Sequence, residues 1–187
     1  MKSILKSLLI LFIYIVPVNA ACDFMANIGE TGGKLFEKFG PPVPYFPGSF
    51  MHQIVSVDIC PNDNLNHAIV VEYVFLGENE SVDKAILAGI KMHVLNDEEN
   101  SESKKLTLMN YAKKVYGDFD TGQNPQIYNN YNIWEKNNTL VIYNRYFDED
   151  ERIHEELFIS NNEYDKKLGE FFDKIEEEQM KAMLGKE

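Results

Sequence analysis

Four histidines and two cysteines are the residues of this chain best suited to metal or nucleophilic chemistry. The segment His154-Glu155-Glu156-Leu157-Phe158 begins like the helix of a zinc protease, in which two histidines four positions apart hold the metal. Phe158 stands where the second histidine would be, so this pair of zinc ligands is incomplete. The other histidines are far apart in the sequence and form no ligand pair at helical spacing: His52, His67 and His93. We therefore expect no metal site.

Other motifs with catalytic or ligand-binding potential are also incomplete. Asp118, Asp120 and Gly122 resemble the start of a calcium loop, but Asn129 occupies the place of its closing glutamate, which favours an ordinary acidic turn. Gly48-Ser49 has no nucleophile-elbow context, and Gly32-Gly33 lacks the spacing of a phosphate-binding loop. The sequence therefore predicts no catalytic residue and no cofactor.

Residues 1–20 have the pattern of a signal peptide. Lys2 and Lys6 give a positive start, Leu8 to Val16 form an apolar run, and Val18-Asn19-Ala20 supplies the small residues of a cleavage site. No later segment has about 18 consecutive apolar residues, so we expect no stable membrane span after the signal is removed. This predicts a periplasmic or secreted protein that starts near residue 21.

Two alternatives to a cleaved signal remain open. The first is an uncleaved N-terminal anchor. The second is lipid attachment at Cys22, although Asn19 then stands where bacterial lipoproteins carry an apolar residue, and Cys60 would be left alone. In an oxidising compartment the simplest expectation is a disulfide between Cys22 and Cys60, which also argues against Cys60 as a nucleophile.

The charge balance restricts the class of partner. The formal net charge is −12, and loss of Lys2 and Lys6 with the signal makes it more negative by two charges, to −14. Such a chain is poorly suited to bind nucleic acid or an anionic lipid surface. The charge indicates either solubility alone or a protein partner that is basic.

Four residues on or beside the predicted strands could anchor a partner: Tyr131, Trp134, Tyr143 and Arg145. Tyrosine, tryptophan and arginine are enriched among the residues that dominate binding energy. Tyr143 and Arg145 alternate with Ile142, so they share one strand face, which we expect to be open. For Trp134 the alternative, burial in the core under the helices, is favoured.

The segment Tyr131–Ile159 is interpreted as the strands around which the fold is organised. Helices are predicted before it, over Lys104–Tyr116 with Leu108, Ala112 and Val115 inward, and after it, from a cap at Asn162 with fraying from Glu178. Its apolar stripe is Tyr164, Leu168, Phe171, Phe172 and Ile175. We expect these helices to cover one face of an antiparallel sheet.

The first half of the chain has a similar order of elements. Thr31 is predicted to cap a short helix over Gly32–Phe39 that ends at Gly40. Strands are predicted over Ile54–Cys60 and Ala68–Leu76 from their alternation and β-branched residues. The segment Val82–Leu95 fits a helix and a strand equally well, and we favour a strand from about Ile86 because Gly89 weakens a helix.

These elements predict an α+β fold made of two helix–sheet units, residues 21–100 and 101–187, the second ending in the amphipathic helix. The shared layout suggests a tandem duplication of a helix–three-strand unit, because one helix over three strands has too small a core alone. Chance similarity of layout is the alternative.

The first predicted helix resembles a known family. Ile28-Gly29-Glu30-Thr31, followed by Leu35, Phe39, Gly40 and Pro42, is similar to the entry of the BamE/SmpA-like domains of the bacterial envelope. The resemblance covers about 15 residues closely. It implies helices on an antiparallel sheet, no enzymatic activity and a role in protein–protein contact, as in the tandem β-lactamase-inhibitor-like proteins. The chain departs from the family in lacking a lipobox before Cys22 and a Gly-x-Thr entry in its second half.

The sequence thus leaves three functional hypotheses. The favoured one is an exported, non-enzymatic protein-binding module, an inhibitor or assembly accessory that acts through an exposed sheet face. The second is a small-ligand carrier or periplasmic enzyme with a site between sheet and helices. The third is an immunity-type protein that neutralises a basic toxin.

Overall fold

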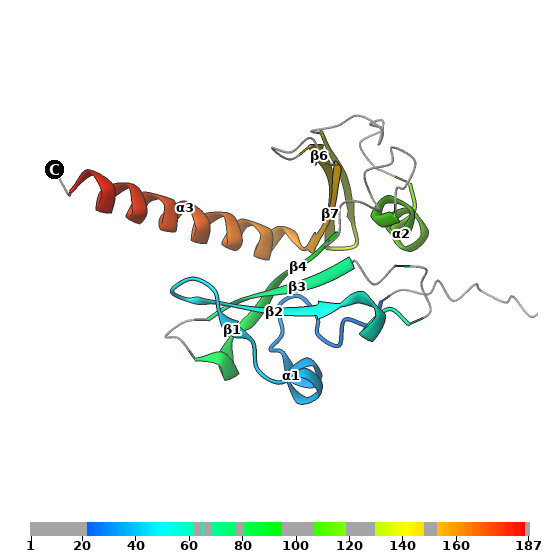
Figure 1. Cartoon of the computed structure of the whole chain (residues 1–187), viewed down its shortest axis with the longest axis horizontal. Coiled ribbons are helices and arrows are strands. Elements are labelled where there is room, and N and C mark those ends of the chain that lie inside the picture. The colour runs from blue at the N-terminus through cyan, green and yellow to red at the C-terminus, as the bar shows by residue number, and fades with distance from the viewer. Residues whose placement is uncertain are drawn as a thin grey trace, which may run out of the picture.

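The computed structural model describes residues 22–61, 65, 69–77, 81–94, 107–118, 130–147 and 153–185. Over these residues the fold is one antiparallel sheet of seven strands with three α-helices, which confirms the predicted α+β class (Figure 1). The strands are β1 (Val43–Pro44), β2 (Ser49–Val55), β3 (Ile69–Leu76), β4 (Ile86–Val94), β5 (Asn130–Lys136), β6 (Thr139–Phe147) and β7 (Ile153–Ser160). The helices are α1 (Gly33–Phe39), α2 (Thr107–Tyr116) and α3 (Asn162–Leu184).

The sheet joins the two predicted units edge to edge. Its strand order is β1-β2-β3-β4-β7-β6-β5, so β4 of the first unit pairs with β7 of the second. This seam is short, with four paired positions from Ile90–Ile159 to His93–Glu156, whereas β6 and β7 share eight. The tandem duplication itself stays a prediction.

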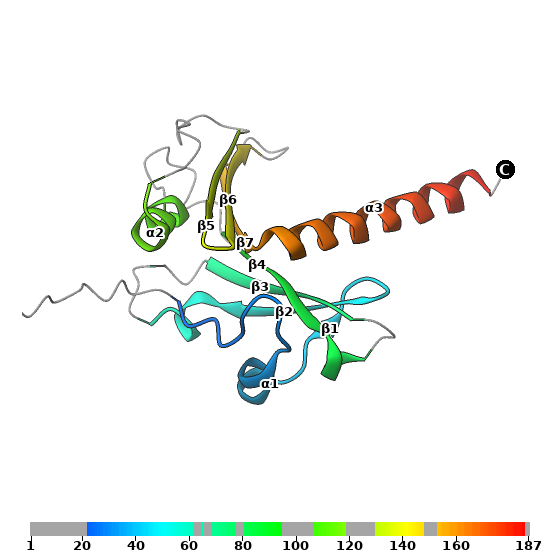
Figure 2. The same ribbon diagram turned by 180° about the vertical axis from the view of Figure 1, so that it is seen from behind.

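The hydrophobic core lies on the sheet face covered by α1, α2 and the segment 22–32. Val71, Tyr73 and Phe75 alternate along β3 and are fully buried on this face, as a strand with one covered side requires. Leu35 of α1 and Leu108 of α2 are buried in the same core cluster. Figure 2 shows α1 against the β2–β4 part of the sheet and α2 against the β5–β7 part.

The last helix lies on the opposite face. Leu168, the buried residue of α3, is close to the Phe158 ring at Gly89, and Phe158 alternates with the core residues Leu157 and Ile159 of β7. The prediction that the helices before and after the strands of Tyr131–Ile159 cover the same face of the sheet is therefore wrong for α3. The apolar stripe of α3 lies on the same face as Phe158, whose side chain points away from the core.

Two local predictions in the first half are wrong. The strand predicted over Ile54–Cys60 ends at Val55, and a 3₁₀ turn follows over Ser56–Asp58. The turn brings Ile59 and Cys60 into the core, where Cys60 forms the predicted disulfide with Cys22. Thr31 does not cap α1; the N-cap is Gly32, with no side-chain hydrogen bond, and Thr31 bridges to Ile86 of β4.

The other elements follow the sequence closely. The segment that fitted both a helix and a strand is a strand from Ile86 to Val94, as favoured, preceded by a 3₁₀ turn over Val82–Lys84, and Leu95 lies outside the described residues. The α3 cap is Asn161, one residue before the predicted Asn162, and its side chain accepts a hydrogen bond from the backbone N–H of Tyr164 at 2.9 Å. The helix then continues to Leu184 without ending at Glu178.

Candidate functional site

The residues predicted to anchor a partner are buried on the α2 side of the sheet. Tyr143 and Arg145 are 0% and 1% exposed, so the expectation that they form an open binding surface is wrong. Trp134 is 2% exposed and its indole N–H donates to the carbonyl of Gly117 at the end of α2, at 2.8 Å, which confirms its core position. Tyr131 lies on β5, but its side chain is outside the described residues.

Tyr143 belongs to a buried latch that holds α2 on the sheet. Glu155 of β7 is 1% exposed and stands directly opposite Arg145 in the register. Its carboxylate accepts a hydrogen bond from the Tyr143 hydroxyl at 2.8 Å and from the backbone N–H groups of Leu108 and Met109 at 3.4 Å. A carboxylate here satisfies unpaired donors of the first helical turn and interacts favourably with the helix dipole. This cluster stabilises the fold and cannot reach a partner.

A different set of polar side chains lies on the opposite face, beside α3; we call the part of this face that α3 does not cover the open face. We call this set the polar row; its members are Gln53, Glu72, Lys91, His93, Tyr146, His154 and Glu156. The register brings it together, because Gln53 pairs with Glu72, Glu72 with Lys91, His93 with Glu156, and Tyr146 with His154. Paired residues share a face of the sheet, so the row crosses β2, β3, β4, β7 and β6.

Mutual contacts hold the polar row in place. Gln53 Nε2 donates to Glu72 Oε1 at 2.5 Å, and Lys91 Nζ lies 2.8 Å from Glu156 Oε2 across the β4–β7 seam. His93 Nδ1 lies 3.8 Å from Glu72 Oε2. The rings of Tyr146 and His154 stack with centroids 5.2 Å apart. The side chains of Glu72 and His93 are only 14% and 25% exposed, so this surface is ordered before any partner arrives.

Burial and neighbouring charges set the protonation of the row. Burial lowers the pKa of His93, with Lys91 and His154 acting in the same direction and Glu72 and Glu156 against it. Burial also disfavours the charged form of Lys91, but the hydrogen bond and charge of Glu156, with Glu72, outweigh it and raise the pKa of Lys91 above its ordinary value. Near neutral pH the row thus presents a neutral His93 beside a firmly charged Lys91–Glu156 pair.

The lowered pKa of His93 gives a pH dependence with a defined sign. The unfolded chain takes up the His93 proton at a higher pH than the folded chain does, so stability is fully present above the ordinary pKa of about 6.5 and falls as the pH drops below it. We expect a His93→Gln variant to lose part of the decline in unfolding free energy between pH 7.5 and 5, measured by urea titration. A His93 resonance that titrates above the ordinary value in an NMR series would contradict this.

Sequence reasoning missed the polar row although a period-two signal was present. His154 was compared with a zinc helix and interpreted instead as a strand histidine beside solvent, but the strand was not aligned with its neighbours. On the strand β7 His154 and Glu156 share the open face, and Glu155 points the other way into the latch. Among the described residues, no group of three or more histidine, cysteine or acidic side chains is arranged to hold a metal ion. His67 and most of the Asp118–Asn124 segment lie outside those residues.

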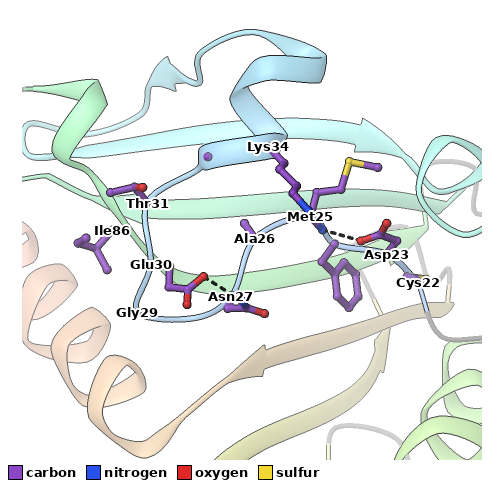
Figure 3. Close-up of a pocket in the computed structure, with 12 residues that line it drawn as sticks. Cys22, Asp23, Met25, Ala26, Asn27, Gly29, Glu30, Thr31, Lys34 and Ile86 are labelled. Atoms are coloured by element: carbon purple, nitrogen blue, oxygen red, sulfur yellow. Dashed lines mark hydrogen bonds between the residues drawn. The ribbon is translucent and has the colours of Figure 1, made fainter.

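A second candidate site is a hollow of about 990 Å³ over the segment 22–34 (Figure 3). The disulfide fixes its start at Cys22, and the floor reaches Ile86 of β4. Its polar groups already bind one another: Asn27 Nδ2 donates to Glu30 Oε2 at 2.9 Å, and the Met25 N–H donates to Asp23 Oδ1 at 3.1 Å. It is built almost entirely from one chain segment, unlike the site between sheet and helices that a ligand carrier would need.

The core beneath this segment contains a hydroxyl without a hydrogen-bond partner among the described residues, that of Tyr73. Burial, with Asp23 and Tyr111, raises the pKa of Tyr73, so the group stays neutral. Because an unpaired buried hydroxyl is desolvated without compensation, we expect Tyr73→Phe to leave the free energy of unfolding unchanged or raise it by up to about 1 kcal/mol. Tyr143→Phe is the matched control, since it removes a hydrogen bond to a carboxylate and should cost about 1.5–3 kcal/mol. Chemical denaturation of both variants tests this, and equal losses would contradict it.

Comparison with known proteins gives no relative: no family model, no curated protein and no solved structure matches this chain. Among the described residues, no helix has the length and apolar character needed to span a membrane.

Proposed function

We propose that this chain is an exported, non-enzymatic binding module, periplasmic or secreted, that contacts a protein partner through the open face of its sheet. The observation that carries the proposal is the polar row, an ordered set of charged, amide and aromatic side chains on the face opposite α1 and α2, beside α3. The signal-like residues 1–20 and the disulfide support the proposal that the protein is exported from the cytoplasm.

The geometry of the row favours recognition of a macromolecular surface. Its side chains are already held by one another, so little side-chain entropy remains to be lost when a partner binds. The row extends over five strands, which is wider than a small molecule needs. Incompletely desolvated charge pairs such as Lys91–Glu156 act mainly on specificity, because a partner must supply groups that match them.

The charge of the whole chain favours a basic partner. A formal net charge of −12, more negative still without residues 1–20, attracts cations over a Debye length and speeds their association. A basic toxin neutralised by an immunity-type protein is one member of this class. The resemblance to BamE/SmpA-like domains supports an inhibitor or accessory role in the envelope, carried by the helix entry at Gly29–Pro42.

Site-specific photocrosslinking in the exporting cell tests the proposal. A photoreactive amino acid at Gln53, an exposed member of the row, should give one adduct of defined mass with a second protein. The same amino acid at Glu37, exposed on α1 across the sheet, is the control and should give none. Lys91→Gln should weaken the Gln53 adduct by removing the fixed charge pair. Absence of an adduct at Gln53, or the same adduct from Glu37, would count against the open face.

A further inference from the structure

The first described residues of the chain are fixed in the core. Cys22 lies one residue after the predicted start of the mature protein, is 7% exposed and is bonded to Cys60. Its backbone N–H donates to the Tyr111 hydroxyl of α2 at 3.3 Å. The next N–H, that of Asp23, donates to the carbonyl of Ile59 at 2.7 Å. While the disulfide is intact, the backbone at Cys22 therefore cannot leave the core.

The residues that follow continue this attachment along the sheet. We call residues 22–31 the strap, and Figure 3 shows it lying against the strands. The Phe24 ring meets the Tyr73 ring of β3 edge-on, with centroids 6.4 Å apart. The Gly29 N–H donates to the carbonyl of Leu87 in β4 at 2.8 Å. Because the strap also bonds to α2 of the second unit, its release would break contacts in both halves of the fold.

This attachment conflicts with cleavage of the predicted signal peptide in the folded state. A protease cuts where the backbone is exposed or is transiently released from the fold. The predicted cleavage point lies between Ala20 and Ala21, so Cys22 is the second residue on its far side and Asp23 the third. Both residues are held by bonds to the core in the oxidised protein. A signal peptidase can therefore bind this stretch only before the strap is in place.

We propose that closure of the strap makes the signal-cleavage bond inaccessible, so that the order of two reactions decides whether the protein is released or stays anchored. One reaction is hydrolysis of the Ala20–Ala21 bond, in which one water leaves a carboxylate on Ala20 and an amine on Ala21. The other is formation of the Cys22–Cys60 disulfide, in which two thiols give two protons and two electrons to a disulfide oxidant of the exporting compartment. Hydrolysis first releases the mature protein, and oxidation first leaves residues 1–20 attached.

Both alternatives to a cleaved signal are connected through this order. An uncleaved anchor is the product of a chain that oxidises and folds before it is cut. Lipid attachment at Cys22 would use the same sulfur as the disulfide, so one chain cannot carry both modifications. The order requires that the chain is exported, as in the proposed function, and it does not involve the polar row.

Cleavage of the full chain, residues 1–187, by a purified signal peptidase in detergent micelles tests the order. The peptidase should cut the reduced chain between residues 20 and 21 at least tenfold faster than the oxidised, refolded chain, measured by gel shift and N-terminal sequencing. Equal rates for the two forms would overturn the proposal and leave export intact. If neither form were cut at this bond, the proposal and the proposed export would fail together.

A spacer distinguishes loss of access from a direct effect of the reductant on the peptidase. Six glycine and serine residues inserted between Ala21 and Cys22 span up to about 20 Å, which moves the cleavage point away from the core and leaves the strap unchanged. The oxidised spacer variant should be cut about as fast as the reduced wild type. The same insertion after Gly185, beyond α3, is the control and should leave the oxidised chain uncut. An oxidised spacer variant that resisted the peptidase would refute the proposal.

Discussion

Replacing Glu155 by alanine should lower the free energy of unfolding by about 3–5 kcal/mol, because it leaves three buried hydrogen-bond donors without their acceptor, at about 1–3 kcal/mol each. Glu155 and Arg145 are both 1% exposed and are paired in the β6–β7 register. The same change removes the acceptor of the Tyr143 hydroxyl and of two N–H groups in the first turn of α2. Urea denaturation followed by circular dichroism measures the loss.

The neighbouring residue provides the control for this prediction. Glu156 differs from Glu155 by one position and points to the open face, where its side chain is 25% exposed and contacts Lys91. Glu156→Ala should cost only about 0.2–1 kcal/mol, the range of partly solvated ion pairs. If the two alanine variants lost similar stability, the latch would not hold α2 as described. Loss of near-ultraviolet signal from Trp134 in Glu155→Ala would show that α2 itself has loosened, since its end binds the indole.

Removing the disulfide should cost about 4 kcal/mol, the loop-closure entropy of a cross-link at this separation. Cys22 and Cys60 are 38 residues apart and both lie in the core. They fix the start of the segment 22–32, whose first backbone groups bond to distant elements: the Asp23 N–H donates to the Ile59 carbonyl at 2.7 Å, and the Cys22 N–H donates to the Tyr111 hydroxyl at 3.3 Å. Unfolding of the oxidised and reduced wild type gives the difference directly.

The double variant Cys22→Ser/Cys60→Ser separates the effect of losing the cross-link from any direct effect of the reductant on stability. It should unfold at the same denaturant concentration with and without reductant, close to the reduced wild type. Thiol titration of the wild type under denaturing, non-reducing conditions should find no reactive thiol. Two reactive thiols, or a stability difference below about 1 kcal/mol, would be inconsistent with the cross-link described here.

The sequence was informative wherever one face of an element is uniformly apolar. The apolar run of β3 and the pattern of α2 each have a single way to be buried, so their positions could be predicted. The face on which α3 packs could not be predicted. Its apolar stripe would fit either face of a sheet, and only the connection after β7 selects one of them. At Ile54–Cys60 the alternation was outweighed by the disulfide, which draws Cys60 inward through a 3₁₀ turn.

The candidate site depended on register, which sequence patterns specify poorly. Arg145 was predicted to be exposed because arginine is seldom buried, and the carboxylate that stands opposite it, Glu155, is located only once β6 is aligned with β7. The polar row could not be predicted for the same reason, because only the strand register brings its members together. Gln53, Glu72, Lys91 and Glu156 come from four strands spread over a hundred residues, and none of them forms a motif alone.

The seam between β4 and β7 has a mechanical consequence. With four paired positions against the eight that β6 and β7 share, it is a narrow joint between the two halves of the sheet, so few backbone hydrogen bonds resist a force that pulls those halves apart. Lys91 and Glu156 bridge this joint on its open side. A molecule seated there would clamp both halves at once, so its arrival should stiffen the whole protein against pulling.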